Sequence, residues 1–223
     1  MDYEEIERKR YERIWKKAAG KFSENPKDYI SNPNPSPSAL RFFLFVSGRL
    51  KTGSFLDIGC GNGRHTVLFA NHFDSVGLDI SKSAIDFAKK HAKEKTVKAN
   101  FRVGSVLKLP YEKDTFDVVM DSGCFHHLRK IQWSLYKKNI LKVLKKGGYY
   151  YLECFSRNTP HMPGFSPRTK NRNWTLRYLH YNHFFTDEEV FKFFSKEFRI
   201  LNNFEYKKKN SPLKFKVFFM KKR

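Results

Sequence analysis

The chain has 223 residues, a length that suits one domain, and it carries 44 lysines and arginines against 22 aspartates and glutamates. Its hydrophobic content of 40% and aromatic content of 17% are enough to build one core, which excludes a wholly disordered chain. The net charge of +22 favours anionic partners such as RNA, an anionic membrane surface or an acidic substrate, although a lysine-rich proteome would produce the same charge.

The first fifty residues precede the regular pattern of the chain. Apolar residues at helical spacing predict a helix over residues 3–19. Prolines and asparagines predict a loop over 20–37, and a second helix follows at about 38–50. We interpret residues 1–50 as a lid-like segment in front of a main domain at 51–223.

From residue 53 onward, short apolar runs alternate with helical stretches, a pattern typical of a parallel sheet with helices on both faces. The expected strands cover residues 54–58, 75–79, 99–103, 116–121 and 148–154. The expected helices cover residues 64–72, 81–94 and 130–146, and the last of them is expected to end at Gly147-Gly148.

The C-terminal part of the chain follows a different pattern. A helix is expected at 187–196, followed by strands at about 198–206 and 213–220 that are joined by a turn at Asn210-Ser211-Pro212. Two strands joined in this way form a hairpin, so we expect the last strand to run antiparallel at the edge of the sheet.

The cysteines and the N-terminus bear on the compartment. Cys60, Cys124 and Cys154 are far apart and form no C-x-x-C pair, so neither a disulfide framework nor a cysteine zinc site is expected. The spacing of the histidines matches no closed metal site, so we expect no metal. The first residues lack a signal peptide's apolar segment, and no apolar run reaches the roughly 18 residues that span a bilayer. We therefore expect a cytoplasmic protein.

The most informative stretch is Asp-Ile-Gly-Cys-Gly-Asn-Gly at residues 57–63, between a strand and a helix. Glycines allow a close approach of the backbone to a ligand at this turn of an α/β sheet. The dinucleotide fingerprint G-x-G-x-x-G is not met, because Arg64 stands in place of its third glycine. Asp57 would repel a pyrophosphate and would suit a cationic ligand such as S-adenosylmethionine. Asp79, at the end of the next strand, can accept bonds from two ribose hydroxyls, or it caps a helix.

On these residues, the chain over about 50–221 resembles the class I S-adenosylmethionine-dependent methyltransferases. The resemblance implies an α/β, doubly wound, Rossmann-like fold of three layers, whose seven-stranded, mainly parallel sheet has its last strand inserted antiparallel. It also implies that S-adenosyl-L-methionine, with S-adenosyl-L-homocysteine as product, is bound by Asp57, Gly59, Cys60, Gly61, Gly63, Asp79, Ile80, Ser105, Val106 and Asp121. Ser105 stands where the family often has an aspartate that reads the adenine amino group, so its hydroxyl or the backbone of Val106 is expected to make that contact.

The fourth predicted strand ends at Asp121 and leads to His126 and His127. The resemblance places Asp121 beside the methionine moiety, and we treat Asp121 and His126 as catalytic candidates. Imidazole titrates near neutral pH, so His126 is a candidate base, with structural packing as the alternative. Methyl transfer from a sulfonium needs mainly in-line positioning, which makes a base optional.

Residues 157–185 combine cations and aromatic rings without a single acid. Such a segment suits an anionic aromatic metabolite or an unstacked RNA base, or it is a solvated loop whose aromatic rings cover the sheet. The residues that we expect to contact the acceptor are Trp15, Tyr29, His126, Arg157, Trp174 and Tyr181.

We therefore interpret the chain as a methyltransferase that acts on an O, N or S atom of a small, anionic or aromatic acceptor. One alternative is an RNA methyltransferase similar to tRNA wobble-uridine enzymes, which the net charge of +22 supports. Another alternative is a non-catalytic, cofactor-binding partner subunit. The complete glycine loop and Asp79 argue against this alternative.

Overall fold

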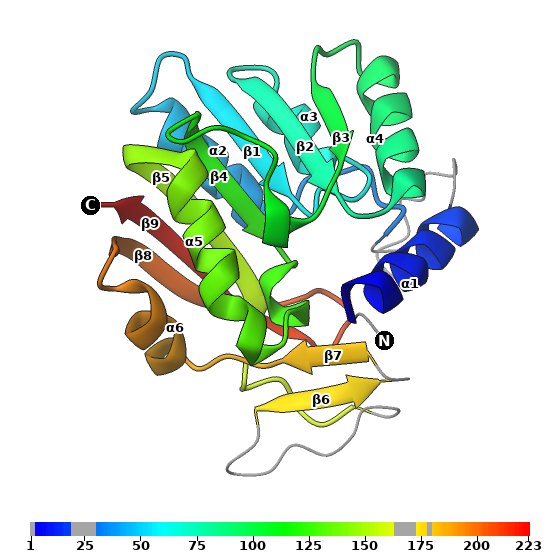
Figure 1. Ribbon diagram of the computed structural model, residues 1–223, viewed down its shortest axis with the longest axis vertical. Coiled ribbons are helices and arrows are strands. Elements are labelled where there is room, and N and C mark those ends of the chain that lie inside the picture. The colour runs from blue at the N-terminus through cyan, green and yellow to red at the C-terminus, as the bar shows by residue number, and fades with distance from the viewer. Residues whose placement is uncertain (1–2, 19–29, 163–172, 178–179) are drawn as a thin grey trace.

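A seven-stranded sheet forms the centre of the protein, whose computed structural model describes residues 3–18, 30–162, 173–177 and 180–223 (Figure 1). In spatial order, its strands are β3 (Asn100–Val103), β2 (Asp74–Asp79), β1 (Ser54–Ile58), β4 (Phe116–Ser122), β5 (Leu144–Phe155), β9 (Lys214–Lys222) and β8 (Phe198–Lys207). Strand β9 runs antiparallel to both of its neighbours, and the pairs from β3 to β5 are parallel. The predicted doubly wound α/β fold with an antiparallel C-terminal strand is confirmed.

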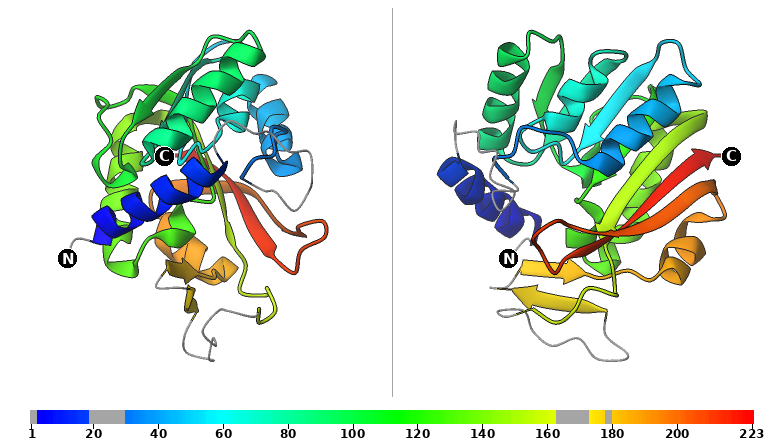
Figure 2. Two further views of the ribbon diagram at one scale, coloured as in Figure 1. Left: turned by 90° about the vertical axis from the view of Figure 1, so that its right-hand side faces the viewer. Right: turned by 180° about the vertical axis from the view of Figure 1, so that it is seen from behind.

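The helices cover both faces of this sheet (Figure 2). They are α2 (Pro37–Ser47), α3 (Arg64–Phe69), α4 (Lys82–Glu94), α5 (Trp133–Val143) and α6 (Asp187–Phe194), with short 3₁₀ turns η1 (Val106–Lys108), η2 (Phe125–His127) and η3 (Lys130–Gln132). Helices α2 and α3 bury Phe42 and Phe69 against one face, in contact with Tyr151. Helices α5 and α6 bury Tyr136 and Phe194 against the other face. Residues 1–50 therefore have two structural roles, since α2 belongs to the core.

The order of the last two strands corrects one expectation. Strand β9 lies inside the sheet between β5 and β8, and β8 is the edge strand. The reason is composition, because β9 is buried along six consecutive residues from Phe215 to Met220 and needs a neighbour on each side. In strand β8, the polar residues Asn202, Asn203 and Glu205 are exposed, which suits the edge of a sheet.

The end of α5 corrects a second expectation. The helix ends at Val143 rather than at Gly147-Gly148, and Leu144 already pairs with Phe116 of β4. Leu144 is fully buried, so its side chain is used in the sheet rather than on a helix. Gly147 has a φ of +74° at the point where the register of β4 and β5 shifts, so the glycine forms a bulge within β5.

Helix α1 (Tyr3–Ala18) lies outside the layers, beside α4 and across the carboxyl ends of the strands (Figures 1 and 2). Its Trp15 packs on Ala84 and Phe87 of α4. Glu12 accepts hydrogen bonds from the Ser81 hydroxyl at 2.8 Å and from the backbone N–H and hydroxyl of Ser83 at 3.1 and 2.6 Å. A carboxylate at the N-terminus of a helix is favoured by the helix dipole, so Glu12 anchors α1 to α4.

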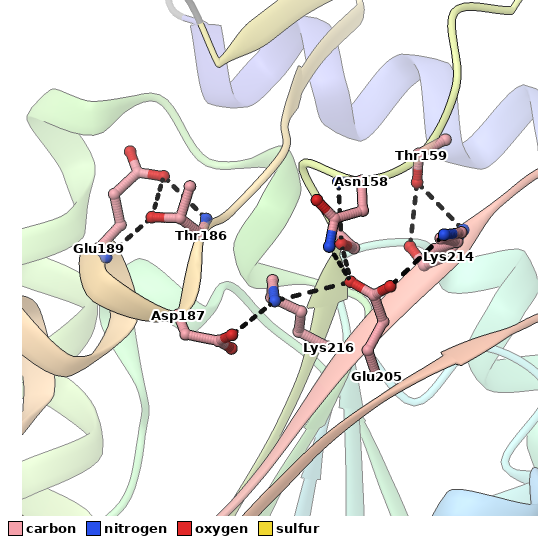
Figure 3. Close-up of polar contacts among 9 residues, drawn as sticks. Asn158, Thr159, Thr186, Asp187, Glu189, Glu205, Lys214 and Lys216 are labelled. Carbon is pink, nitrogen blue, oxygen red and sulfur yellow. Dashed lines mark hydrogen bonds and ion pairs between the residues drawn. The ribbon is translucent and has the colours of Figure 1, made fainter.

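A hairpin of β6 (Trp174–Arg177) and β7 (His180–His183) forms a separate two-stranded sheet that the sequence pattern did not predict. It follows the end of β5, where a polar network joins four parts of the chain (Figure 3). Lys216 lies between Asp187 of α6 at 2.9 Å and Glu205 of β8 at 3.6 Å. Asn158 donates to Glu205 at 2.9 Å, and Thr159 exchanges hydrogen bonds with the backbone of Lys214. The network fixes this end of the sheet.

Within the described residues, no helix combines the length and apolar character needed to cross a bilayer.

Candidate active site

A cavity of about 750 Å³ opens at the carboxyl ends of the parallel strands, the edge where open α/β sheets bind ligands. Its floor comes from the turns that follow β1, β2, β3 and β4. Its walls come from α1, η2, β7 and the end of β5, together with the hairpin between β8 and β9. The sequence motifs and the N-terminal helix therefore meet in one place.

The glycine loop after β1 forms the centre of the floor. Gly59 and Gly61 have φ values of +69° and +56°, in the left-handed region that favours glycine. A Cβ on Gly61 would come within 2.8 Å of the Trp15 ring, so α1 closes directly on the loop. Asn62 holds the loop from the other side, because its side-chain amide donates to the carbonyls of Ile30 and Asn32 at 3.0 and 2.8 Å. The predicted Gly59, Cys60 and Gly61 all line the cavity.

Asp79 lies at the end of β2 and also lines the cavity. One carboxyl oxygen accepts the backbone N–H of Gly61 at 3.0 Å, and the other accepts that of Ser81 at 2.9 Å. Burial raises the pKa of this carboxyl to about 6, although the backbone donors act in the opposite direction. Each oxygen of a carboxylate has a second lone pair, so Asp79 can still accept two hydrogen bonds from a ligand.

The next part of the floor is more apolar. Ile80, Ser105 and Val106 line the cavity, as predicted for residues around an adenine ring. The Ser105 hydroxyl accepts the backbone N–H of Leu107 at 3.0 Å and thereby caps η1. The side chain of Ser105 therefore already has a structural partner, which leaves its donor hydrogen for another contact.

Asp57 is placed behind this wall, since it is 1% exposed and is not among the described residues that line the cavity. The Thr66 hydroxyl donates to it at 2.7 Å, and burial raises its pKa to about 7. Gly63 is likewise behind the wall, where a Cβ would meet Ala88 and Phe101 at 2.8 and 2.9 Å. Both residues shape the loop from beneath.

Asp121 organises the turn between β4 and η2. Its two oxygens accept the backbone N–H groups of Gly123, Cys124 and Phe125 at 2.7–3.1 Å, and Tyr136 donates its hydroxyl at 2.6 Å. Burial raises the pKa of the carboxyl to about 7. In the described structure Asp121 does not line the cavity, so it positions the residues of this turn that do.

His126 does line the cavity, and its ring stacks on Phe155 with centroids 3.7 Å apart. The side chain is buried, and burial lowers its pKa well below the usual range, as do the nearby His180 and His183. Nδ1 of His126 has no hydrogen-bond partner among the described residues. The ring is therefore a neutral imidazole whose Nδ1 is buried without a hydrogen-bond partner in the described structure.

Of the other residues predicted to contact the acceptor, some line the cavity and some do not. Trp15 lines the cavity, and Tyr29 lies outside the described residues. Arg157, Trp174 and Tyr181 are not among the described lining residues. Trp174 stacks on Tyr181 instead, and the Tyr181 hydroxyl lies 3.1 Å from Nδ1 of His183.

The structure adds side chains that the sequence reasoning missed. From α1, Glu7 and Tyr11 join Trp15 in the wall, and from β7, His180 and Asn182 do so. Two signals were present in the sequence. Residues 7, 11 and 15 are spaced by four and so share one helix face, and residues 180 and 182 alternate with 181 and 183 along a strand.

The profile of a protein family described as a methyltransferase domain matches residues 50–208. The chain is 31% identical over 110 residues to the ubiquinone biosynthesis O-methyltransferase of Coxiella burnetii, covering 49% of this chain and 46% of that protein. It is 34% identical over 132 residues to phosphoethanolamine N-methyltransferase 3 of Arabidopsis thaliana, covering 57% and 26%. The matches thus span less than half the length of these two relatives.

Among solved structures, the chain resembles the 1,6-didemethyltoxoflavin-N1-methyltransferase of Burkholderia thailandensis, which was crystallised with 1,6-didemethyltoxoflavin and S-adenosylhomocysteine. The TM-score is 0.76, with 99% of this chain and 88% of that chain covered. The sequence identity is 16%, so the likeness concerns the fold.

Proposed function

The chain belongs to the methyltransferase domain family, and on this premise we propose that it transfers a methyl group from S-adenosylmethionine to an O, N or S atom of a small acceptor. The observation that carries the proposal is one cavity of about 750 Å³, whose described lining includes both the glycine loop and aromatic side chains. Its volume lies within the range of roughly 300–1,000 Å³ that is usual for small-molecule sites.

The residues of the floor fit the cofactor. Asp79 presents carboxylate lone pairs for two ribose hydroxyls, and Ile80 and Val106 present apolar surface for adenine. The backbone of the glycine loop leaves room for the methionine part, because side chains are absent at Gly59 and Gly61. When bound, S-adenosylmethionine supplies an electrophilic methyl group on a sulfonium.

The aromatic side chains of the cavity support a planar acceptor. Tyr11, His126, Phe155 and Phe215 line the cavity, and their rings provide flat surface. Helix α1 contributes Glu7, Tyr11 and Trp15 to the wall of the cavity, which limits the size of an acceptor.

Cations in the same wall support an anionic acceptor. Arg10, Arg64 and Lys208 line the cavity. Burial and the nearby charge of Arg64 together lower the pKa of Lys208 to about 8. An anionic group on the acceptor would stabilise the charged form of this lysine.

The test is to incubate the purified protein and methyl-labelled S-adenosylmethionine with a cell lysate, then to separate low-mass compounds, RNA and protein. We expect label in the low-mass fraction, and none with Asp79→Asn at the same cofactor concentration. Label in the RNA fraction would overturn the small-acceptor assignment. Binding of S-adenosylhomocysteine without label in any fraction would indicate a non-catalytic partner subunit.

A further inference from the structure

A carboxylate and an imidazole meet in the wall of the cavity, from opposite ends of the chain. Oε2 of Glu7 in α1 lies 2.9 Å from Nδ1 of His180 in β7. Glu7 is 8% and His180 is 6% exposed, and both side chains line the cavity. A buried acid is costly unless it is paired, so this contact fixes the position of both groups.

The pair determines which ring nitrogen of His180 is basic. An ionised carboxylate only accepts hydrogen bonds, so Nδ1 carries the hydrogen and Nε2 keeps its lone pair. Nε2 lies 3.4 Å from the Tyr11 hydroxyl, near the upper limit for a hydrogen bond. Burial raises the pKa of Tyr11 well above its usual value, so its hydroxyl stays protonated beside this nitrogen.

The other histidines of the wall are poorer proton acceptors. Burial lowers the pKa values of His65, His126 and His127 well below the usual range. Among the described histidines that line the cavity, only His180 has a carboxylate within hydrogen-bond distance. The carboxyl group of Glu7 lies against Nδ1 of His180, whereas no carboxylate of the described residues lies within hydrogen-bond distance of His126.

We propose that His180 is the general base of the methyl transfer and that Glu7 positions it and stabilises its protonated form. In this step the acceptor heteroatom uses a lone pair to bond the methyl carbon. The carbon–sulfur bond of the sulfonium breaks with its electron pair left on sulfur, and the heteroatom's proton passes to Nε2 of His180. The products are the methylated acceptor, S-adenosylhomocysteine and an imidazolium that is paired with Glu7.

This assignment narrows the acceptor class of the proposed function, on which it rests. A base is useful only for an acceptor that loses a proton, such as a phenol, an enol, a thiol or a ring N–H. A tertiary amine or a thioether has no such proton and would gain nothing from the pair. We therefore expect a protic, planar acceptor.

The test uses methyl-labelled S-adenosylmethionine and the low-mass fraction of the lysate as the acceptor source. We expect His180→Ala to lower the initial rate of labelling by about 10²–10⁴-fold. We also expect added imidazole to restore part of this rate, because a free base can enter the space left by the ring. His161→Ala, at an exposed histidine, is the matched control and should keep the wild-type rate.

Glu7→Gln separates a chemical from a purely structural role of Glu7. The amide oxygen still accepts from Nδ1, so α1 stays in place, but the negative charge is lost. We expect a decrease in kcat of about tenfold or more with KM for the low-mass acceptor within twofold. A rise in KM with an unchanged kcat would show that Glu7 only shapes the site.

Binding of S-adenosylhomocysteine, measured by calorimetry, keeps the two proposals distinguishable. Both variants should bind it within about twofold of the wild type, which also shows that they are folded. If wild-type protein labels nothing, the proposed function fails. If His180→Ala binds the product and labels the low-mass fraction at near the wild-type rate, the base assignment is overturned and the proposed function stands.

Discussion

The Trp15 ring lies directly over Gly61, so that a Cβ at position 61 would come within 2.8 Å of Cζ2 and 3.0 Å of Cη2 of the ring. The N-terminal helix and the glycine loop are therefore complementary surfaces. The loop needs glycine at position 61 for two reasons: its backbone is left-handed, and the Trp15 ring occupies the space that a side chain would need.

Gly61→Ala is expected to disturb both the backbone of the glycine loop and the position of Trp15. The left-handed conformation costs an alanine roughly 1–2 kcal/mol, and the methyl group pushes Trp15 away. We expect a lower melting temperature and at least tenfold weaker binding of S-adenosylhomocysteine by calorimetry. Gly48→Ala is the matched control, because Gly48 has a φ of −72° and meets only the Leu44 carbonyl at 3.3 Å. Equal affinities of the two variants would contradict the proposed contact between loop and cofactor.

Glu12→Ala is expected to release α1 from α4. The carboxylate accepts three hydrogen bonds from Ser81 and Ser83, and these bonds hold its pKa at about 2 although partial burial opposes this. Their loss should weaken product binding about tenfold and speed cleavage of α1 by trypsin, because a protease cuts an undocked helix more readily. Glu5→Ala removes only exposed pairs with Arg8 and Lys9 on the same helix and serves as the control. Unchanged proteolysis of Glu12→Ala would contradict the anchoring role.

The part of the site that sequence predicts best is the part made of adjacent residues. The glycine loop and Asp79 follow consecutive strands, and the carboxyl ends of parallel strands meet at one edge of a sheet. The family assignment rests on these residues, and the family and fold are confirmed. Local sequence did not distinguish residues that line the cavity from residues that hold its loops in place. Asp57 accepts a hydrogen bond from Thr66, and Asp121 accepts backbone N–H groups of the turn after β4.

The acceptor side was less predictable, because it depends on how distant elements dock. Glu7 and His180 are 173 positions apart, and neither residue has a local motif. The edge position of β8 was also not predicted. The sequence contained a signal for it, since β8 includes Asn202, Asn203 and Glu205 whereas β9 includes the apolar run from Val217 to Met220. In each case tertiary packing, rather than local propensity, decided the outcome.

Product affinity is expected to depend on pH through Asp79. Its carboxyl has a pKa of about 6 in the free protein, and ribose hydroxyl donors favour the ionised form. Binding therefore releases a proton at acidic pH, so affinity for S-adenosylhomocysteine should rise between about pH 5 and pH 7 and level off above. Calorimetry at four pH values checks this. Asp79→Asn should bind at least tenfold more weakly with a flat profile, and a flat wild-type profile would remove the ribose role.

Asp57 is expected to make a contribution to stability that falls as pH rises through neutrality, because its carboxyl is buried behind the glycine loop. Burial raises its pKa from 3.8 to about 7, although Thr66 and Arg64 act in the opposite direction. The folded state thus binds a proton that the unfolded state has released. The contribution is fully present below about pH 4 and is lost as pH rises through about 7, with each pKa unit equivalent to about 1.4 kcal/mol.

Urea unfolding at pH 5 and pH 8 measures this loss. The buried, neutral His65, His126 and His127 contribute with the opposite sign, since their contribution to stability is lost as pH falls, so the change caused by Asp57→Asn is the quantity to compare. The free energy of unfolding at pH 8 minus that at pH 5 should be more positive in Asp57→Asn than in the wild type, because an amide does not ionise and its oxygen still accepts from Thr66. Asp121, whose pKa is also about 7, leaves part of the pH dependence in the variant. Asp86→Asn removes an exposed pair with Lys82 and should leave the difference unchanged. An equal pH dependence in Asp57→Asn and the wild type would mean that Asp57 is ionised in the folded protein.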